Sequence, residues 1–284
     1  MRYYVIIPAH NEEAFLGQTL TSVTLQTFLP AKVVVVNDHS TDGTSSVISQ
    51  FTEVYPFIKQ LNVTSGNEHL PGSKVIRAFN LGLQLLDDHY DFIVKLDADV
   101  VLPPNYFETL HNVFSNHPNI GIAGGFIHEQ DKLGHWVLNH PMDKDHVRGA
   151  IKAYSKPCFN AIGGLKEAMG WDTVDELLAK YHGYTIYTDS HLKVQHLRPL
   201  GKAYNSKAKL LQGRAMFRMR YGFWISMIAS LKMAWKQKRG VAFQDNMLGY
   251  LKAKNEAVSY LVSPEEGKFI RQLRWRNIKK KLRP

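Results

Sequence analysis

The chain of 284 residues is 44% hydrophobic, carries a formal net charge of +10 and contains one cysteine, Cys158. This length and composition allow a full hydrophobic core, and they exclude a disulfide-framed miniature domain and a low-complexity, disordered chain. A single cysteine fits a reducing, cytoplasmic location, with Cys158 expected as a small buried side chain.

The charge is unevenly distributed along the chain. Residues 1–200 hold 15 Lys and Arg against 21 Asp and Glu, whereas residues 201–284 hold 20 against 4. Such a basic segment indicates an anionic partner, either nucleic acid or an anionic membrane surface. No nucleic acid is expected, because no recognition motif accompanies the charge.

The first hundred residues alternate between strand and helix patterns. Buried parallel strands are predicted by short apolar runs at 4–8, 33–37 and 92–96. Amphipathic helices are predicted over 11–26, from a Ser/Thr-rich start at 40–46, and over 73–86. This alternation implies right-handed crossovers and a doubly wound α/β sheet, whose ligands bind at the carboxyl ends of the strands.

Beyond residue 100 the alternation is less regular. A strand is predicted over 120–130, a helix over 175–185 that Gly183 closes, and a further strand over 193–197. From about residue 205 onward the chain is expected to form helices that are both apolar and basic.

Two carboxylates, Asp97 and Asp99, stand where the run at 92–96 reaches a loop. A pair of acids one residue apart can hold a divalent cation and bind a ribose, although such pairs also occur by chance in acidic loops. Two further strands, upstream in the sequence, end in similarly polar segments. The three segments together point to a nucleotide site at one edge of the sheet.

The upstream segments contain groups suited to a nucleotide base. Asp38 could accept the imino proton of a pyrimidine, and Asn11 with the backbone after Pro8 could frame the same base. Asn11 and Ser40 have an equally good local interpretation, as the N-cap of the helix over 11–26 and as part of a helix-starting turn.

Three motifs occur in order along the chain: I-P-A-x-N-E-E, V-V-N-D-x-S-T-D-G-T and L-D-A-D. Over residues 1–200 the chain resembles glycosyltransferase family 2, which has the GT-A fold. The resemblance implies inverting, metal-dependent transfer of a sugar from a nucleotide diphosphosugar, UDP- or GDP-linked. The resemblance implies that Pro8 and Asn11 frame the nucleotide base and that Asp38 forms a hydrogen bond to it. It also implies that Asp97 contacts the ribose or the sugar and that Asp99 holds Mg²⁺ or Mn²⁺.

The chain departs from this family at the third helix. Many members carry an Arg just before the Asn of that helix, where this chain has Phe79. Lys74 or Arg77 is the candidate replacement for its positive charge, and the alternative is an ordinary solvated helix face. Arg148 is a candidate contact for phosphate or a plain surface charge.

The catalytic base is expected in residues 170–184, which occupy the place of the family's Glu-Asp motif. Trp171 replaces the Glu, so Asp172 is the expected base and Asp175 the alternative; both could instead only favour the start of a helix. His196 follows this segment, where related enzymes often place a metal-binding His; the equally good alternative is a purely structural role.

The carboxyl-terminal third combines an apolar stripe with cations. Its stripe consists of Trp224, Ile228, Leu231 and Trp235, which recur at helical spacing. Such a helix suits a membrane interface, and the tail at 271–283 repeats the combination. The alternative is that the stripe packs on the rest of the protein. The longest uncharged run, 221–231, is too short to span a bilayer.

The expected organisation is a GT-A type doubly wound mixed sheet flanked by helices over 1–204, with a nucleotide-binding half at 1–100 and an acceptor or catalytic half at 101–204. A basic amphipathic helical extension is expected over 205–284. The expected enzyme lies peripherally on the inner face of the cell membrane and acts on a lipid-linked or cell-envelope glycan. The rivals are a non-catalytic nucleotide-sugar-binding or membrane adaptor protein and a nucleotidyltransferase, although no glycine-rich basic loop follows the first strand.

Overall fold

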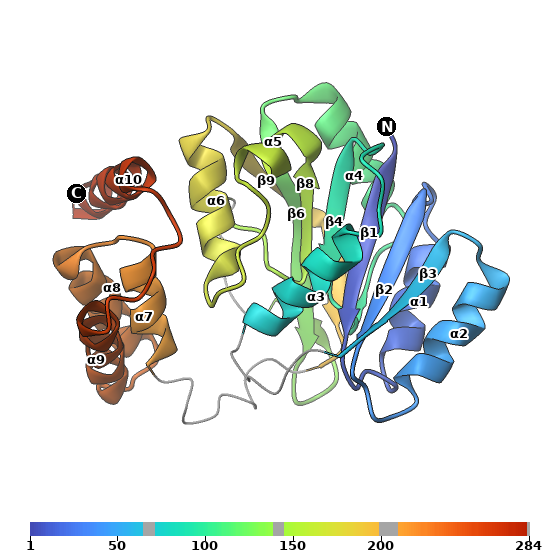
Figure 1. Cartoon of the computed structure of the whole chain (residues 1–284), viewed down its shortest axis with the longest axis horizontal. Coiled ribbons are helices and arrows are strands. Elements are labelled where there is room, and N and C mark those ends of the chain that lie inside the picture. The colour runs from blue at the N-terminus through green and yellow to red at the C-terminus, as the bar shows by residue number, and fades with distance from the viewer. Residues whose placement is uncertain (65–71, 139–144, 199–209, 283–284) are drawn as a thin grey trace.

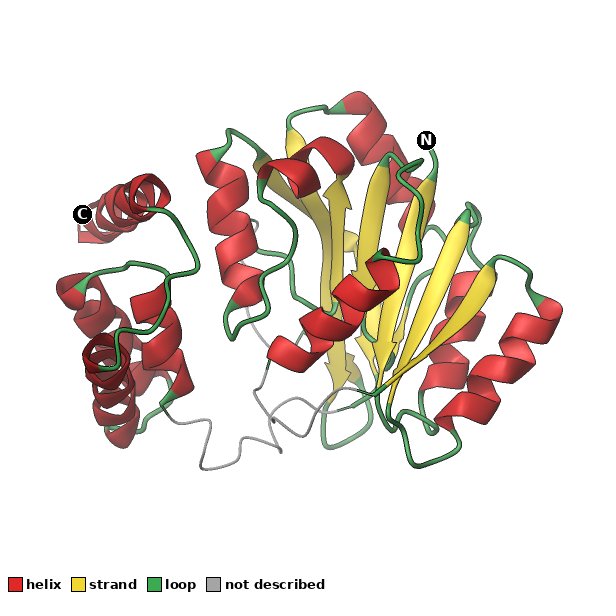
Figure 2. Cartoon of the chain, viewed as in Figure 1, coloured by secondary structure: helices red, strands yellow, loops and turns green. Residues whose placement is uncertain are grey.

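The structure, a computed structural model, describes residues 1–64, 72–138, 145–198 and 210–282 (Figure 1). A mixed sheet forms its centre, with strand order β3-β2-β1-β4-β8-β6-β9-β5 and β7 paired to β6 (Figure 2). Its strands are β1 (Tyr3–Ala9), β2 (Lys32–Asp38), β3 (Ile58–Val63), β4 (Phe92–Leu96), β5 (Val100–Val101), β6 (Ile120–Gln130), β7 (Trp136–Val137), β8 (Ile151–Ser155) and β9 (Thr185–His196).

The amino-terminal half confirms the predicted doubly wound arrangement. The runs at 4–8, 33–37 and 92–96 lie within β1, β2 and β4, and β1 pairs in parallel with the other two. The crossover helices are α1 (Leu16–Thr24), α2 (Thr44–Val54) and α3 (Ser73–Leu83). From β1 the chain moves outward to β2 and β3, then α3 returns it to β4 on the other side of β1. Figure 1 accordingly shows α3 in front of the sheet.

One local expectation was wrong here, and one strand was not anticipated. Asn11 does not cap a helix, because its backbone is left-handed at φ 55° and α1 begins only at Leu16. Its side-chain oxygen instead accepts the backbone N–H of Thr41 at 2.8 Å. The strand β3 was not anticipated, because this edge strand is largely polar and mostly only partly buried.

The second half extends the sheet with antiparallel and parallel pairs. The strand expected over 120–130 is β6, and the one expected over 193–197 is the much longer β9, which pairs with β6 and, antiparallel, with β5. The helices here are α4 (Tyr106–Asn116), α5 (Lys156–Ala161) and α6 (Trp171–Tyr181). The last begins four residues before the expected start, and Gly183 follows it at φ 84°. Cys158 is buried in α5.

Helices make up the described chain from residue 211 onward, gathered beyond α6 in Figure 1. They are α7 (Leu211–Arg218), α8 (Phe223–Lys236), α9 (Val241–Asn255) and α10 (Pro264–Leu282). The expected boundary at 204 lies outside the described residues. Gly213 and Gly249 let α7 and α9 touch backbone to backbone, since a Cβ on either would lie 2.0 Å or less from a carbonyl oxygen of the other segment. No helix in the described ranges combines the length and apolarity needed to cross a bilayer.

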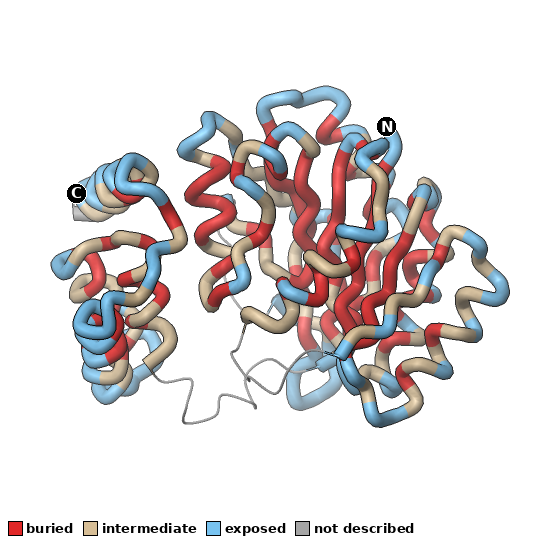
Figure 3. The backbone as a smooth tube through the Cα atoms, in the orientation of Figure 1, coloured by how far each residue is buried: buried red, intermediate tan, exposed pale blue. Residues whose placement is uncertain are grey.

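The apolar stripe on α8 points away from the protein. The face of α8 that is buried carries mainly small side chains, Ser226, Ser230 and Ala234 among them, which allows close packing against α9. Three of the four side chains of the stripe remain in solvent, with exposed fractions of 62% for Trp224, 51% for Leu231 and 82% for Trp235, whereas Ile228 is partly buried. Figure 3 shows how much of these carboxyl-terminal helices is exposed. Most of this stripe therefore does not pack on the rest of the protein.

Candidate functional site

A cavity of about 310 Å³ opens at the carboxyl ends of β1, β2 and β4. The strand order reverses between β1 and β4, and open α/β sheets bind their ligands at such a point. The residues that line it are Pro8, Ala9, His10, Glu12, Asp38, Lys74, Val75, Ala78, Asp97, Ala98, Asp99 and Arg198. Five of the side chains expected in the site, those of Pro8, Asp38, Lys74, Asp97 and Asp99, thus meet in one cavity.

The loop that carries Asp97 and Asp99 is held on both sides. The Asp97 amide donates to the carbonyl of Ala150 at 2.8 Å, and the carbonyl of Asp99 accepts the Leu197 amide at 2.8 Å. Between them, the Thr19 hydroxyl donates to the Ala98 carbonyl at 2.8 Å. The backbone that carries the two carboxylates is therefore held in place by the rest of the protein.

Asp99 lies in an unfavourable environment for a carboxylate. Burial raises its pKa, and the neighbouring charge of Asp97 raises it further, against the attraction of His196 and Arg198. The pairing of Val100 with His196 in β5 and β9 brings His196 Nε2 to 3.5 Å from Asp99 Oδ1. The other ring nitrogen, Nδ1, is buried without a hydrogen-bond partner.

These groups fit a divalent cation in part. Crowded carboxylates attract positive charge, and a carboxylate oxygen with an imidazole nitrogen suits Mn²⁺. Among the described residues, however, no group of three or more His, Cys, Asp or Glu side chains is placed to hold a metal ion. Any cation here would need further ligands from a substrate or from water, which is usual for Mg²⁺ at phosphate sites.

The end of the cavity near β2 is built by two interlocked loops. Asp38 is buried, and its carbonyl oxygen lies 2.6 Å from Nδ1 of His10. The Asn11 amide donates to the Ser40 hydroxyl at 3.0 Å, and neither residue lines the cavity. Asn11 and Ser40 therefore hold together the loops after β1 and β2.

An ion pair at the cavity joins residues that the sequence does not connect. Arg198 lies 2.6 Å from a carboxylate oxygen of Glu12 and 3.9 Å from one of Asp99. Both Glu12 and Arg198 were missed, although they stand in the quoted N-E-E motif and two residues after His196. Burial raises the pKa of Glu12 to about 7, opposed by Arg198 and assisted by the charges of Asp99 and Asp97.

The other expected cations are less well placed. Lys74 lines the cavity, whereas Arg77 is exposed on α3 and does not. Arg148 lies 3.8 Å from the buried Glu129 and is absent from the cavity lining. Arg198 is thus a better-placed cation for a diphosphate than Arg148.

The two candidate bases lie in different environments on α6. Asp172 is partly buried in the first turn, next to Trp171. Asp175 is only 2% exposed, and both of its carboxylate oxygens lie within 3.0 Å of Lys152 Nζ. The Tyr154 hydroxyl also donates to it at 2.6 Å. This enclosure counts against Asp175 as the base, although neither acid lines the cavity.

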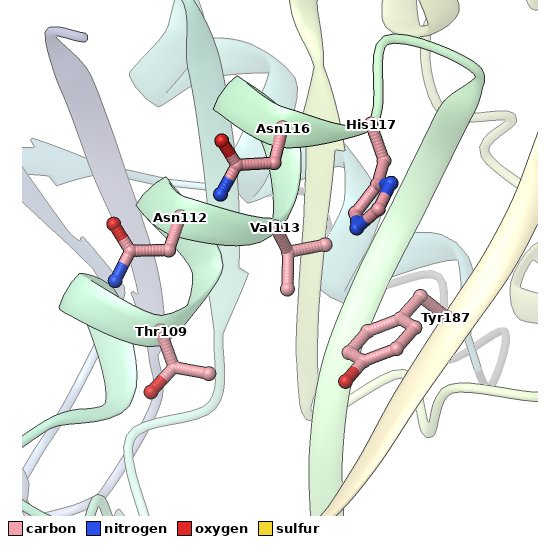
Figure 4. Close-up of a pocket in the computed structure, with 6 residues that line it drawn as sticks. All are labelled: Thr109, Asn112, Val113, Asn116, His117 and Tyr187. Atoms are coloured by element: carbon pink, nitrogen blue, oxygen red, sulfur yellow. The ribbon is translucent and has the colours of Figure 1, made fainter.

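A second, smaller hollow of about 200 Å³ lies between α4 and β9 (Figure 4). It is lined by Thr109, Asn112, Val113, Asn116, His117 and Tyr187. No carboxylate and no Lys or Arg lines it, so it lacks the groups that a nucleotide requires.

Comparison with known proteins gives one family and one fold. The family model described as Glycosyl transferase family 2 matches residues 4–171. An uncharacterized glycosyltransferase of Haemophilus influenzae is 26% identical over 123 residues, which cover 43% of this chain. The match spans 36% of that relative's own length.

Solved glycosyltransferases have a similar fold. The mannosyltransferase PcManGT from Pyrobaculum calidifontis, in complex with GDP-Man and Mn²⁺, is 17% identical with a TM-score of 0.55, over 98% of this chain and 75% of that one. S. aureus TarS 1–349 in complex with UDP-GlcNAc is 16% identical with a TM-score of 0.58, over 98% and 79%. The predicted GT-A type fold is confirmed by these similarities.

The raised pKa of Glu12 makes a prediction for stability. Folded Glu12 keeps its proton to about pH 7, whereas its ordinary pKa is 4.5. Folding takes up a proton between these values, so the contribution of Glu12 to the free energy of unfolding falls as the pH rises through this window. Glu12→Gln should flatten that fall, which urea unfolding at several pH values in metal-free buffer will measure. Glu13→Gln serves as the control, and equal slopes for the wild type and Glu12→Gln would contradict the prediction.

Proposed function

This chain belongs to glycosyl transferase family 2, and from that membership we propose that it transfers a sugar from a nucleotide diphosphosugar, UDP- or GDP-linked, to a hydroxyl acceptor. The observation that carries the proposal is the single cavity lined by Asp38, Asp97, Asp99, Lys74 and Arg198. Such a donor needs hydrogen-bond acceptors for its base and ribose and cations for its diphosphate, and this cavity offers both.

Each part of the donor has a proposed partner. The base binds between Pro8 and Asp38, in a pocket whose loops Asn11 and Ser40 hold together. Asp97 accepts hydrogen bonds from the ribose or the sugar. Lys74 and Arg198 attract the diphosphate, and Arg198 would exchange part of its contact with Glu12 for the phosphate oxygens.

Asp99 and His196 are the proposed ligands of Mg²⁺ or Mn²⁺. Two observations support this: the Asp99 carboxylate lies close to Nε2 of His196, and Nδ1 of the same ring has no hydrogen-bond partner. When bound, the cation would supply positive charge against the charge that develops on the departing diphosphate. The chain's own cation in that region is Arg198, 3.9 Å from Asp99.

The proposed reaction is a single displacement with inversion at the anomeric carbon. Asp172 takes the proton from the acceptor hydroxyl, whose oxygen forms the new bond as the bond to the diphosphate breaks. Trp171, next to Asp172, places its ring 5.3 Å from Lys95 Nζ, and Lys95 contacts Asp97. The base helix therefore packs beside the donor-binding loop.

We expect metal-dependent release of nucleotide from at least one donor. The test is a panel of UDP- and GDP-sugars, including UDP-GlcNAc and GDP-mannose, with and without Mn²⁺. Asp99→Asn should lower the Mn²⁺-dependent rate by roughly a hundredfold or more, because it removes a charged ligand. Asp131→Asn, which changes an acid distant in sequence, is the matched control. Tight donor binding with no release from any donor would instead favour a non-catalytic binding protein.

The base assignment makes a separate prediction. Asp172→Asn should lower transfer by roughly 10²- to 10⁴-fold, the usual contribution of a general base. The affinity for the donor nucleotide should remain unchanged, since Asp172 does not line the cavity. Rates and nucleotide dissociation constants of Asp172→Asn and Asp175→Asn will separate the two acids. The assignment is reversed if only Asp175→Asn abolishes transfer with binding intact.

The proposed acceptor is a lipid-linked or cell-envelope glycan, reached from a peripheral position on the inner face of the cell membrane. The support for this position is the exposed face of α8, the stripe of Trp224, Leu231 and Trp235 beside the cations Lys236 and Arg239. Indole rings prefer the interface between headgroups and acyl chains, and an anionic leaflet attracts the flanking cations.

The membrane position predicts a loss of vesicle binding when both indoles are removed. Burying about 100 Å² of each ring would contribute roughly 2 to 3 kcal/mol per ring, so Trp224→Ser with Trp235→Ser should weaken partitioning by at least about a hundredfold. Flotation with vesicles rich in phosphatidylglycerol will measure it. Leu25→Ser, which changes an exposed apolar side chain on the catalytic part, is the matched control. Binding that ignores the indole changes or the anionic lipid would defeat the proposal.

A further inference from the structure

Two lysines lie side by side in the interior of the sheet. Lys95 on β4 and Lys152 on β8 are direct cross-strand partners, and their exposed fractions are 1% and 0%. Like charges in this arrangement repel, and each buried ammonium group requires compensation. Each lysine of such a pair therefore needs a negatively charged or hydrogen-bonding partner.

The partners of the two lysines belong to the two functional parts of the protein. Lys95 pairs with Asp97 at the donor cavity. Lys152 Nζ donates to the backbone carbonyl of Asp172 at 2.5 Å and to Asp175 at 2.9 and 3.0 Å, and it lies 3.0 Å from Glu176. Lys152 thus contacts the first turn of α6, the turn that carries the proposed base.

The ring of Trp171 packs against both ammonium groups. Its centroid lies 5.3 Å from Lys95 Nζ and 5.8 Å from Lys152 Nζ, within the range of a cation–π contact. Gly149 leaves room for this ring, since a Cβ there would lie 2.7 Å from one of its carbon atoms. The position of Trp171, and with it the start of α6, is therefore tightly determined.

We propose that Lys152 is a positioning residue for Asp172. This inference requires the proposed function, since it assigns to Lys152 the placement of the base in that reaction. Lys152 binds the backbone of the base residue itself, and Trp171 packs that turn against Lys95 and so beside Asp97. A displacement of about 1 Å can cost a hundredfold in rate, so a bond of this kind has a catalytic consequence without touching the substrate.

The test compares two variants that differ only at Lys152. Asp175→Asn removes one buried acid but keeps Lys152 and its bond to the Asp172 carbonyl. The double variant Lys152→Met with Asp175→Asn removes that bond, and it leaves Glu176 with the amide of Val147 at 2.9 Å and with His146 at 2.9 Å. Because Asp175→Asn removes the buried negative charge that Lys152→Met alone would leave without a partner, the double variant is expected to fold.

The probes are UDP-GlcNAc and GDP-mannose with Mn²⁺. We expect the double variant to release nucleotide at least tenfold more slowly than Asp175→Asn, with dissociation constants for UDP and GDP within about twofold. Hydrogen exchange at the amides of 171–176 should be faster in the double variant, a readout independent of turnover. Tyr154→Phe, which removes another hydrogen bond to Asp175, should lower the melting temperature without slowing nucleotide release.

Each contrary result has a distinct meaning. Equal rates for the single and double variants, with a lower melting temperature for the double, would show that Lys152 only stabilises the fold. Loss of all release in Asp175→Asn itself would make Asp175 the base and overturn the role of Lys152. A folded wild type that releases nucleotide from no donor would end the proposed function, and this inference with it.

Discussion

Crowded negative charge is the constraint on which this site depends. Glu12, Asp97 and Asp99 line one cavity, and the repulsion among them, added to burial, raises the pKa of both Glu12 and Asp99. Such an arrangement persists only because cations lie beside it, namely Arg198 toward solvent and Lys95 inside the sheet. A protein that keeps this unfavourable cluster is one prepared to bind positive charge, and that is the electrostatic basis of the proposed metal-assisted chemistry.

The buried cations extend the same principle toward α6. The ring of Trp171 packs on the ammonium groups of both Lys95 and Lys152. The charge of Lys152 is met by Asp175 and Glu176, one turn further along α6. Asp172 is the partly buried acid at the start of this helix.

The sequence predicted the features that depend on residues close together in the chain. Continuous apolar runs identified β1, β2 and β4, because strands covered on both faces need such runs, and the polar residues after them fell into one cavity. The N-cap at Asn11 was wrong because its side chain bonds to Thr41, a partner that only the paired loops supply. Hydrophobicity alone could not predict which face of α8 is buried. Close helix packing buries its small side chains and leaves Trp235 exposed. Arg198 and Glu12 were missed because no spacing rule relates residues so far apart.

The ion pair between Glu12 and Arg198 separates its partners by 186 residues, and β5 meets its partner β9 only at Val100 and Val101. A chain emerging from the ribosome can form β1 to β4 long before it can add β9. The acids of the cavity would then stand without Arg198 and His196 until nearly two hundred residues have been made. The proposed donor site would in this sense be completed late in synthesis, after the strands that carry its acids have formed.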